Sequence, residues 1–290
     1  MSYNIKHPTP NEWIKFFDKL FLILTGLFFV SSVGFFIAYN WEAMGKFFKF
    51  ILIEVGIISL VIVSLYVSSK TISDIMILFA SFLVGIFMAL FGQVYQTQAD
   101  SWELFFYWAL VISPWVWTNR FVGTWLLWII LFEISMWLYF ENYIHTSTQF
   151  LWIVFGFNTA FLAIWQYIST KLNIKYAFIL YKMLFFFSTM SIISLMFTKN
   201  LILPILVWGL WIGAIYYFYR YKTINIYALS MMSLSVIVVS DILVVRLLDK
   251  IHIQDMMMPL LMIGFITIGL GASLANWLKS VSKELDNDAR

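Results

Sequence analysis

Long apolar runs recur along the whole chain, with only short polar connections between them. Most reach the roughly 17–25 residues that a helix needs to cross a bilayer. Backbone N–H and C=O groups in hydrocarbon must be satisfied within the segment, so the runs are expected to be helices. The sequence therefore predicts an all-α, polytopic integral membrane protein with about ten transmembrane helices. The runs lie at about residues 20–39, 47–67, 75–95, 104–118, 121–140, 150–168, 178–197, 201–219, 224–245 and 259–277.

The fourth run is the weakest of the ten. It is short, and Pro114 interrupts it. Proline has no backbone N–H, and its ring clashes with the preceding helical turn. The alternative is therefore a protein with nine spans, in which a re-entrant segment replaces the fourth helix.

Composition supports the membrane class and excludes several functions. The chain is 62% hydrophobic and 11% charged, whereas soluble domains are roughly 45–50% apolar and about 25% charged. It has no cysteine, which excludes disulfides and thiolate metal sites. It also has no nucleotide-binding loop, dinucleotide fingerprint or His-Glu-x-x-His motif. We therefore expect no cofactor and no metal ion, and a net charge of +3 does not indicate a nucleic-acid partner.

The segment before the first run has the features of a helix start. Thr9 and Asn11 are candidate N-caps. Trp13, Phe16 and Phe17 fall at helical spacing, which favours a short amphipathic helix in the interface; a plain extension of the first span is the alternative. We expect four parts: a cytoplasmic N-terminal segment with this short helix (1–19), two transmembrane halves of five spans each (20–140 and 141–277) and a charged cytoplasmic tail (278–290).

The distribution of Lys and Arg predicts the orientation. Ten spans place both termini on one side of the membrane, and cytoplasmic loops carry an excess of basic residues. With the N-terminus inside, thirteen of the 18 basic residues lie inside, and both ends are predicted to be cytoplasmic. The five on the outer side are Lys46, Lys49, Lys199, Arg246 and Lys250.

The most polar interruption in the first half of the chain follows the third run. Gln93, Gln96 and Gln98, with Asp100 and Glu103, stand where a plain connection needs only a turn. We infer a polar site at the outer end of the third helix. Small residues recur every four positions on the face that leads to Gln93, which lets a neighbouring helix approach closely. They are Ser81, Gly85 and Ala89.

Parts of this stretch have structural alternatives. The segment Asp100-Ser-Trp-Glu103 has the spacing of a capping box, which would account for both carboxylates without a ligand. Trp41 and Trp102 fit an interfacial aromatic belt. The alternative is that they stack on a sugar or a cation.

Three acidic residues fall inside apolar runs, all toward the outer half of the membrane. A carboxyl at that depth is costly and marks a functional hypothesis. Glu133 shares a helical stripe with Trp137 and Glu141. Glu54 and Asp241 have simpler alternatives, because Glu54 can reach toward basic residues at the outer end and Asp241 can pair with Arg246. Proton coupling is the proposed role of Glu133, Glu54 and Asp241.

Two motifs resemble one family. The stretch from Gly92 to Phe106, followed by Trp108-Ala-Leu and Pro114-Trp115, is similar to the signature of the bacterial membrane family called domain of unknown function 2157. The segment Phe36-Ile-Ala-Tyr-Asn-Trp41 resembles its earlier motif, and the family pattern has Gly where this chain has Gln98. The resemblance implies a multi-pass protein of the bacterial inner membrane without an assigned activity. It directs attention to Tyr39, Asn40, Trp41, Gln93, Tyr95, Gln96, Thr97 and Asp100.

Three functions fit these residues. The first is a secondary transporter or flippase, in which the polar residues and Trp102 bind a small polar, cationic or lipid-linked ligand at the outer side. The second is a non-catalytic module that binds a lipid-linked glycan or an envelope partner. The least favoured is an intramembrane enzyme that uses Asp100 and Glu133 as acid and base. Membrane lipids are expected partners in every case.

The predicted orientation can be measured on the cysteine-free background. A Gln98→Cys variant should react with an impermeant maleimide added to intact cells, and a Ser282→Cys variant should react only after permeabilisation. Equal labelling of both variants from outside would contradict two cytoplasmic ends.

Overall fold

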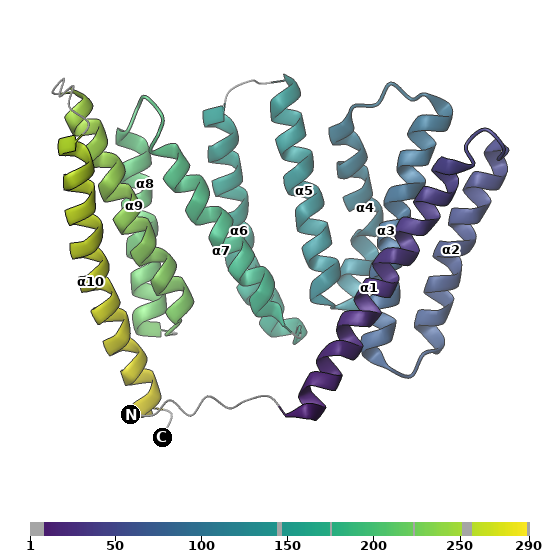
Figure 1. Cartoon of the computed structure of the whole chain (residues 1–290), viewed down its shortest axis with the longest axis horizontal. Helices are drawn as coiled ribbons and strands as arrows, with labels where there is room; N and C mark the ends of the chain where they lie inside the picture. Colours follow the sequence, from purple (N-terminus) through teal and green to yellow (C-terminus); the bar gives the residue numbers. More distant parts are fainter. Residues whose placement is uncertain (1–8, 144–146, 175, 223, 251–256, 289–290) are drawn as a thin grey trace. The chain divides into compact units, whose positions relative to one another are not determined.

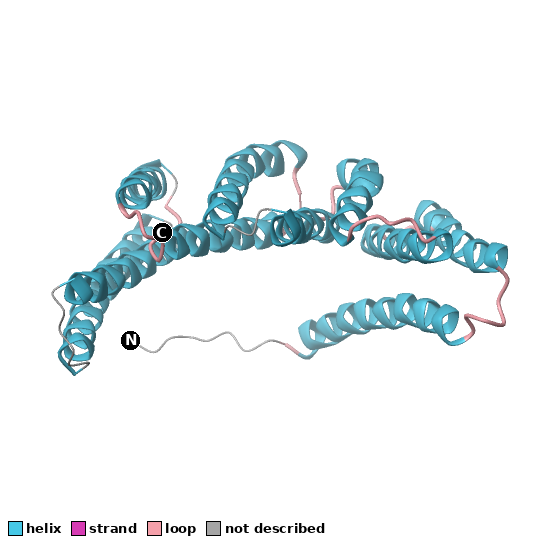
Figure 2. Ribbon diagram, turned by 90° about the horizontal axis from the view of Figure 1, so that it is seen from above, coloured by secondary structure: helices cyan, strands magenta, loops and turns pink. Residues whose placement is uncertain are grey.

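The computed structural model describes residues 9–143, 147–174, 176–222, 224–250 and 257–288. Ten α-helices make up nearly all of this described part (Figure 1), and Figure 2 shows them joined by loops. The predicted all-α class is confirmed. The first five are α1 (Pro10–Tyr39), α2 (Lys46–Tyr66), α3 (Lys70–Tyr95), α4 (Ser101–Asn119) and α5 (Val122–Tyr143). The others are α6 (Ser147–Leu172), α7 (Ala177–Leu195), α8 (Ile202–Tyr217), which continues as a π-helical turn (Phe218–Lys222), α9 (Ile226–Lys250) and α10 (Met257–Asp288).

Nine of the helices in the described ranges are long and apolar enough to cross a membrane, and α4 is the other. Although Pro114 lies inside it, α4 is continuous over 19 residues and runs back along α3 (Figure 1). The hydroxyl of Ser113 donates to the carbonyl of Ala109, and that of Thr118 to the carbonyl of Pro114, so carbonyls near the proline gain partners. In the described structure this segment is thus one continuous helix, although it falls outside the nine candidate spans.

The first helix is longer than the sequence indicated. Thr9 is its N-cap and forms a capping box with Glu12, and the helix then runs without a break to Tyr39. Its 30 residues span about 45 Å, more than the roughly 30 Å hydrocarbon core. The expected amphipathic helix is therefore the first turns of α1, because no helix breaker separates it from the span.

The chain divides into two compact units, unit 1 (Met1–Asn142) and unit 2 (Tyr143–Arg290). The division lies two residues from the expected boundary between the transmembrane halves. Unit 1 is built on α3, against which α1, α2 and α4 pack. Unit 2 is built on α7, which packs against α6, α8 and α9, while α10 packs against α9.

Glycines allow the helices of unit 1 to approach closely. A Cβ added at Gly26 of α1 would overlap the ring of Phe79 on α3. A Cβ at Gly85 would overlap the indole of Trp108, whose Nε1 donates to the Ser81 carbonyl at 2.7 Å. The small-residue face of α3 is therefore the seam for α4, as its spacing predicted.

Gly85→Ala tests this seam. We expect it to lower the free energy of unfolding by about 1–3 kcal/mol, because the new methyl group must displace a hydrogen-bonded indole. The measurement is thermal or denaturant unfolding of purified protein in mild detergent. The control is Gly209→Ala in α8, where a Cβ meets nothing within 4 Å. That change should be neutral or stabilising, because alanine favours helices over glycine. Equal stability of the two variants would contradict the packing described for Trp108.

Candidate functional site

The two motif segments end at the same end of unit 1. Antiparallel packing of α1, α2 and α3 places the C-terminus of α1, the N-terminus of α2 and the C-terminus of α3 together (Figure 1). Trp41 and Val94 both pack against the core cluster of this unit. The ring of Tyr95 stacks on Phe50 of α2, with centroids 5.9 Å apart. The arrangement agrees with the shared side that the sequence predicted for both motifs.

Trp41 covers a buried lysine. Lys49 is only 4% exposed, and its Nζ lies 3.5 Å from the centroid of the Trp41 ring. The ring face thus attracts an ammonium group that has left most of its water, a contact worth about 0.5–2 kcal/mol. The preceding residue, Asn40, ends α1 and donates from its side chain to the Phe36 carbonyl. Trp41 therefore holds a cation of this chain against one face of its ring.

Gln96 makes the turn that ends α3. It has φ 46° and ψ 46°, in the left-handed region where glycine is usual. Its N–H and that of Thr97 both donate to the carbonyl of Gly92, which closes the helix end. The connection tightens again where the N–H of Ala99 donates to the Thr97 carbonyl. The polar stretch is thus an ordered turn, with its strained residue two positions before Gln98.

Asp100 occupies the N-cap position of α4 with an extended backbone, but its side chain makes no capping hydrogen bond. The reciprocal capping box expected with Glu103 is therefore wrong, although the position of the helix start is right. The Asp-x-x-Glu spacing alone did not distinguish a capping box from a helix start without one, because a capping hydrogen bond depends on the side-chain rotamer.

The other predicted ligand-binding residues surround this turn without closing over it. Gln93, Tyr95 and Gln96 are exposed, Thr97 is half-buried, and Tyr39 is 91% exposed. The half-buried Trp102 packs its ring against Phe106 and Tyr139, and its carbonyl accepts from Ser135 of α5. These residues form an open polar rim at one end of unit 1.

The three acids of the spans lie on three different helices. Glu54 is exposed on α2, Glu133 is half-buried on α5, and Asp241 is half-buried on α9 of unit 2. Asp241 Oδ2 accepts a 2.8 Å hydrogen bond from Thr267 of α10, and its Oδ1 is buried with no hydrogen-bond partner among the described residues.

Asp241 lines a cavity of about 440 Å³ together with Arg246 and apolar side chains of Phe197, Val238, Ile242 and Val245. Arg246 donates to the carbonyl of Thr198 at 2.7 Å. The ion pairs within the described part join Lys70 with Asp74 and Arg220 with Glu284, so the pairing considered for Asp241 and Arg246 is not formed. An acid and a base thus face one cavity without neutralising each other.

The sequence reasoning missed a polar cluster at the opposite end of unit 1. Lys70 Nζ lies 2.7 Å from Asp74 Oδ1 and 3.4 Å from Asn119 Oδ1. The amide nitrogen of Asn119 donates to the Asp74 carbonyl, which joins the start of α3 to the end of α4. The four-residue spacing of Lys70 and Asp74 was a visible signal, but nothing pointed to Asn119. Across the described ranges, no three His, Asp or Glu side chains gather as metal ligands would.

The helices and their apolar surfaces define a multi-pass α-helical membrane protein. Residues 6–125 match the model of the family described as "Predicted membrane protein (DUF2157)", and both motifs that carry the resemblance lie within the match. The resemblance recognised from the two motifs is therefore confirmed over residues 6–125. No curated protein and no solved structure matches the chain significantly.

Trp41→Ala should destabilise unit 1 by about 2–4 kcal/mol, because it removes a large packed ring and leaves a buried ammonium without its contact. Unfolding in mild detergent measures the effect, and Trp41→Phe should retain part of the stability. The control is the exposed neighbour Tyr39→Ala, for which we expect a change within about 0.5 kcal/mol. If the Trp41 and Tyr39 variants are equally stable, the Lys49 contact contributes nothing.

Proposed function

We propose that this multi-pass membrane protein is a proton-coupled secondary transporter or flippase of the bacterial inner membrane. The observation that carries the proposal is Asp241, a carboxyl within a spanning helix that lines a cavity. Ionisable side chains at such depth are rare in membrane proteins and commonly mark proton or substrate pathways.

One carboxylate oxygen of Asp241 is left to bind a donor group. The Thr267 hydroxyl donates to Oδ2, while Oδ1 is buried and has no hydrogen-bond partner within the described residues. A donor group of a substrate, or a transported proton, on Oδ1 would satisfy this buried atom. Arg246 faces the same cavity and offers a positive charge to an anionic group of the substrate.

The polar rim of unit 1 is a separate candidate surface for binding the substrate. Gln93 and Gln96 present exposed amides, and the half-buried Asp100 lies across the same turn. In the predicted orientation this end and the Asp241 end of unit 2 both face outward. Glu133 and Glu54 remain candidate proton carriers, and Glu133 is the more shielded of the two.

Proteoliposomes that hold a pH-sensitive dye test the proposal. Panels of amines, amino acids and sugars are added outside, and a fluorescent phospholipid in the same vesicles reports flipping. We expect at least one substrate to drive proton entry or flipping, and Asp241→Asn to abolish that coupling while the protein stays folded. The control is Asp18→Asn, the same chemical change at an exposed carboxylate of α1, which should retain full activity. Full coupling in Asp241→Asn would refute the assigned proton site.

A non-catalytic module that binds a lipid-linked glycan is the second candidate. It is favoured by the exposed rings of Tyr39 and Tyr95 beside the exposed amides of Gln93 and Gln96, because aromatic rings and amides are suited to sugars. Native mass spectra of protein released from its own membrane distinguish the two. A bound mass that Gln93→Ala and Asp100→Ala lose, and that Asp241→Asn keeps, would support the module over the transporter.

A further inference from the structure

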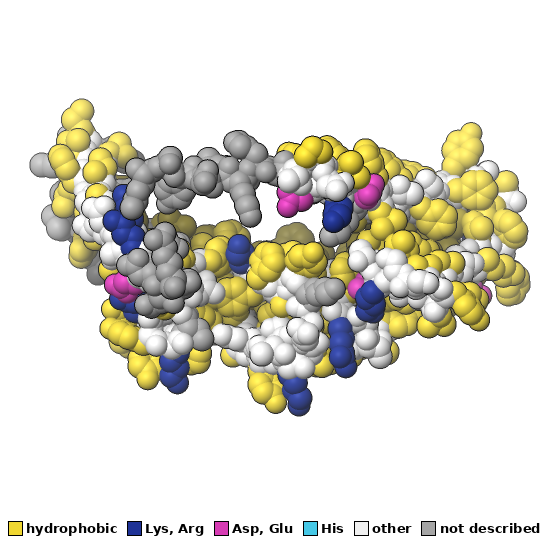
Figure 3. All heavy atoms as spheres, turned by 90° about the horizontal axis from the view of Figure 1, so that it is seen from below, with side chains coloured by type: hydrophobic (Ala, Val, Ile, Leu, Met, Phe, Trp, Pro, Cys, Tyr) yellow, Lys and Arg dark blue, Asp and Glu magenta, His cyan; other side chains and the backbone are white. Residues whose placement is uncertain are grey.

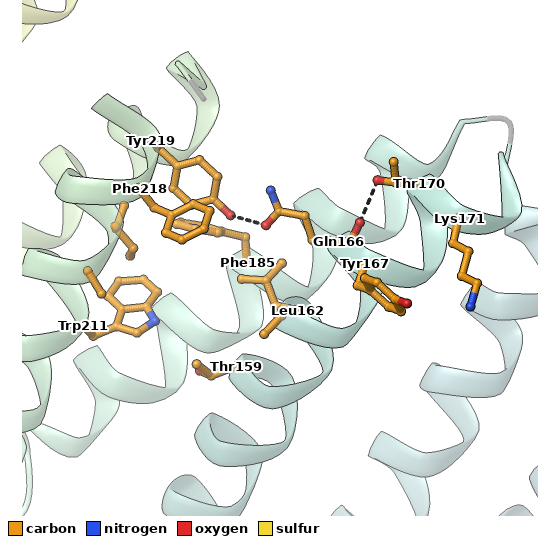
Figure 4. A pocket seen from close by; sticks show the side chains of 13 residues that line it. Thr159, Leu162, Gln166, Tyr167, Thr170, Lys171, Phe185, Trp211, Phe218 and Tyr219 are labelled. Carbon is orange, nitrogen blue, oxygen red and sulfur yellow. Dashed lines mark hydrogen bonds between the residues drawn. The ribbon is translucent and has the colours of Figure 1, made fainter. Parts of the chain in front are cut away.

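Unit 2 contains a cavity of about 650 Å³ between α6, α7 and α8 (Figure 4). Its floor is Phe185 of α7, which is fully buried, and its walls come from Leu162 on α6 and from Trp211 and Ile215 on α8. Both α6 and α8 pack on α7, so the space between them forms a groove along spanning helices. A groove with mainly apolar walls along spanning helices is suited to hydrocarbon.

Polar groups gather at the end of this cavity where α6 ends. The hydroxyl of Tyr219, in the π-helical turn after α8, donates to Gln166 Oε1 at 3.1 Å (Figure 4). This bond uses the oxygen of the Gln166 amide and leaves its NH₂ group to donate. Thr170 donates to the backbone carbonyl of Gln166, and Lys171 stands at the mouth with its Nζ 5.7 Å from the Tyr167 ring. The cavity is therefore apolar inside and cationic at one end.

The same end of unit 2 is basic. Helices α6, α8 and α10 end there, and α7 and α9 begin there. Figure 3 views the chain from this end and shows Lys and Arg side chains standing out along it. Glu284 is paired with Arg220 at 2.7 Å, so it does not cancel the charge at the mouth. Within the described ranges, the basic side chains of this end are Lys171, Lys182, Arg220, Lys222, Lys279 and Lys283.

We infer that this cavity binds an anionic phospholipid, with an acyl chain between α6 and α8 and the phosphate against Lys171. An acyl chain gains little by leaving the bilayer for an equally apolar groove, so the headgroup decides which lipid is held. Basic pockets between spanning helices on the cytoplasmic side are known to hold anionic headgroups, and the predicted orientation places this end in the cytoplasm. The inference concerns unit 2 alone and does not depend on transport.

The full-length protein in mild detergent is titrated with phosphatidylglycerol or with phosphatidylcholine of the same chains, and bound lipid is counted by native mass spectrometry. We expect wild type to retain phosphatidylglycerol about fivefold better, the effect of one basic residue near the headgroup. Lys171→Gln should abolish this preference. The matched control is Lys279→Gln, an exposed lysine of α10 that does not line the cavity and should keep the preference.

The position of the acyl chain is tested by filling the groove. Ala214 of α8 lines the cavity, so Ala214→Phe should lower retention of both lipids severalfold. Ala272→Phe, at an exposed position of α10 outside the cavity, should not. Inorganic phosphate added alone should not displace the lipid, and displacement would assign the site to free phosphate.

Three results would overturn the inference: equal retention of both lipids by wild type, equal losses in the Lys171 and Lys279 variants, or unchanged retention in a folded Ala214→Phe variant. Asp241→Asn should bind lipid as wild type does. A loss of transport with lipid retained, or the reverse, therefore separates this site from the proposed transport activity.

Discussion

The structure depends on one constraint, which is that polar groups within a bilayer must find their partners inside the protein. Helices satisfy the backbone, and many side-chain hydroxyls then donate to carbonyls one turn back, as Ser81 and Thr189 do. Two indole N–H groups find carbonyls on neighbouring helices. Trp108 donates to Ser81 and Trp165 to Ala177. Such bonds fix the rotation of one helix about its axis relative to its neighbour. Apolar packing alone fixes that rotation poorly, because lipid tails are as apolar as the helix surfaces.

Departures from this rule mark the functional candidates. Asp241 has one carboxylate oxygen bonded by Thr267 and the other buried without a partner in the described structure. Gln166 has its oxygen bonded by Tyr219 and an amide NH₂ left for a ligand. Each group keeps a charge or a donor at a cost in solvation, which a purely structural side chain would not need.

Two cavities of unit 2 differ in the chemical groups that line them. The one beside Asp241 and Arg246 carries both signs of charge at the end that the predicted orientation places outside. The one between α6 and α8 is apolar with a cationic mouth at the opposite end. The family match covers residues 6–125, so these cavities lie outside the segment that carries the resemblance. The roles proposed for these cavities therefore rest on their own side chains and not on the family resemblance.

The sequence by itself determined the class, the positions of the helices and the α3 face that would pack closely, because hydrocarbon permits few backbone solutions and hydropathy records each span. It also led to Asp241 as an unusual intramembrane acid. Only the tertiary structure decided which side chains meet. It joined Asp241 to Thr267 across 26 residues and Gln166 to Tyr219 across 53, and it left Glu54 exposed and Asp100 without its capping bond. Such partners depend on the rotation and register of packed helices, which the apolar pattern of a membrane helix does not specify.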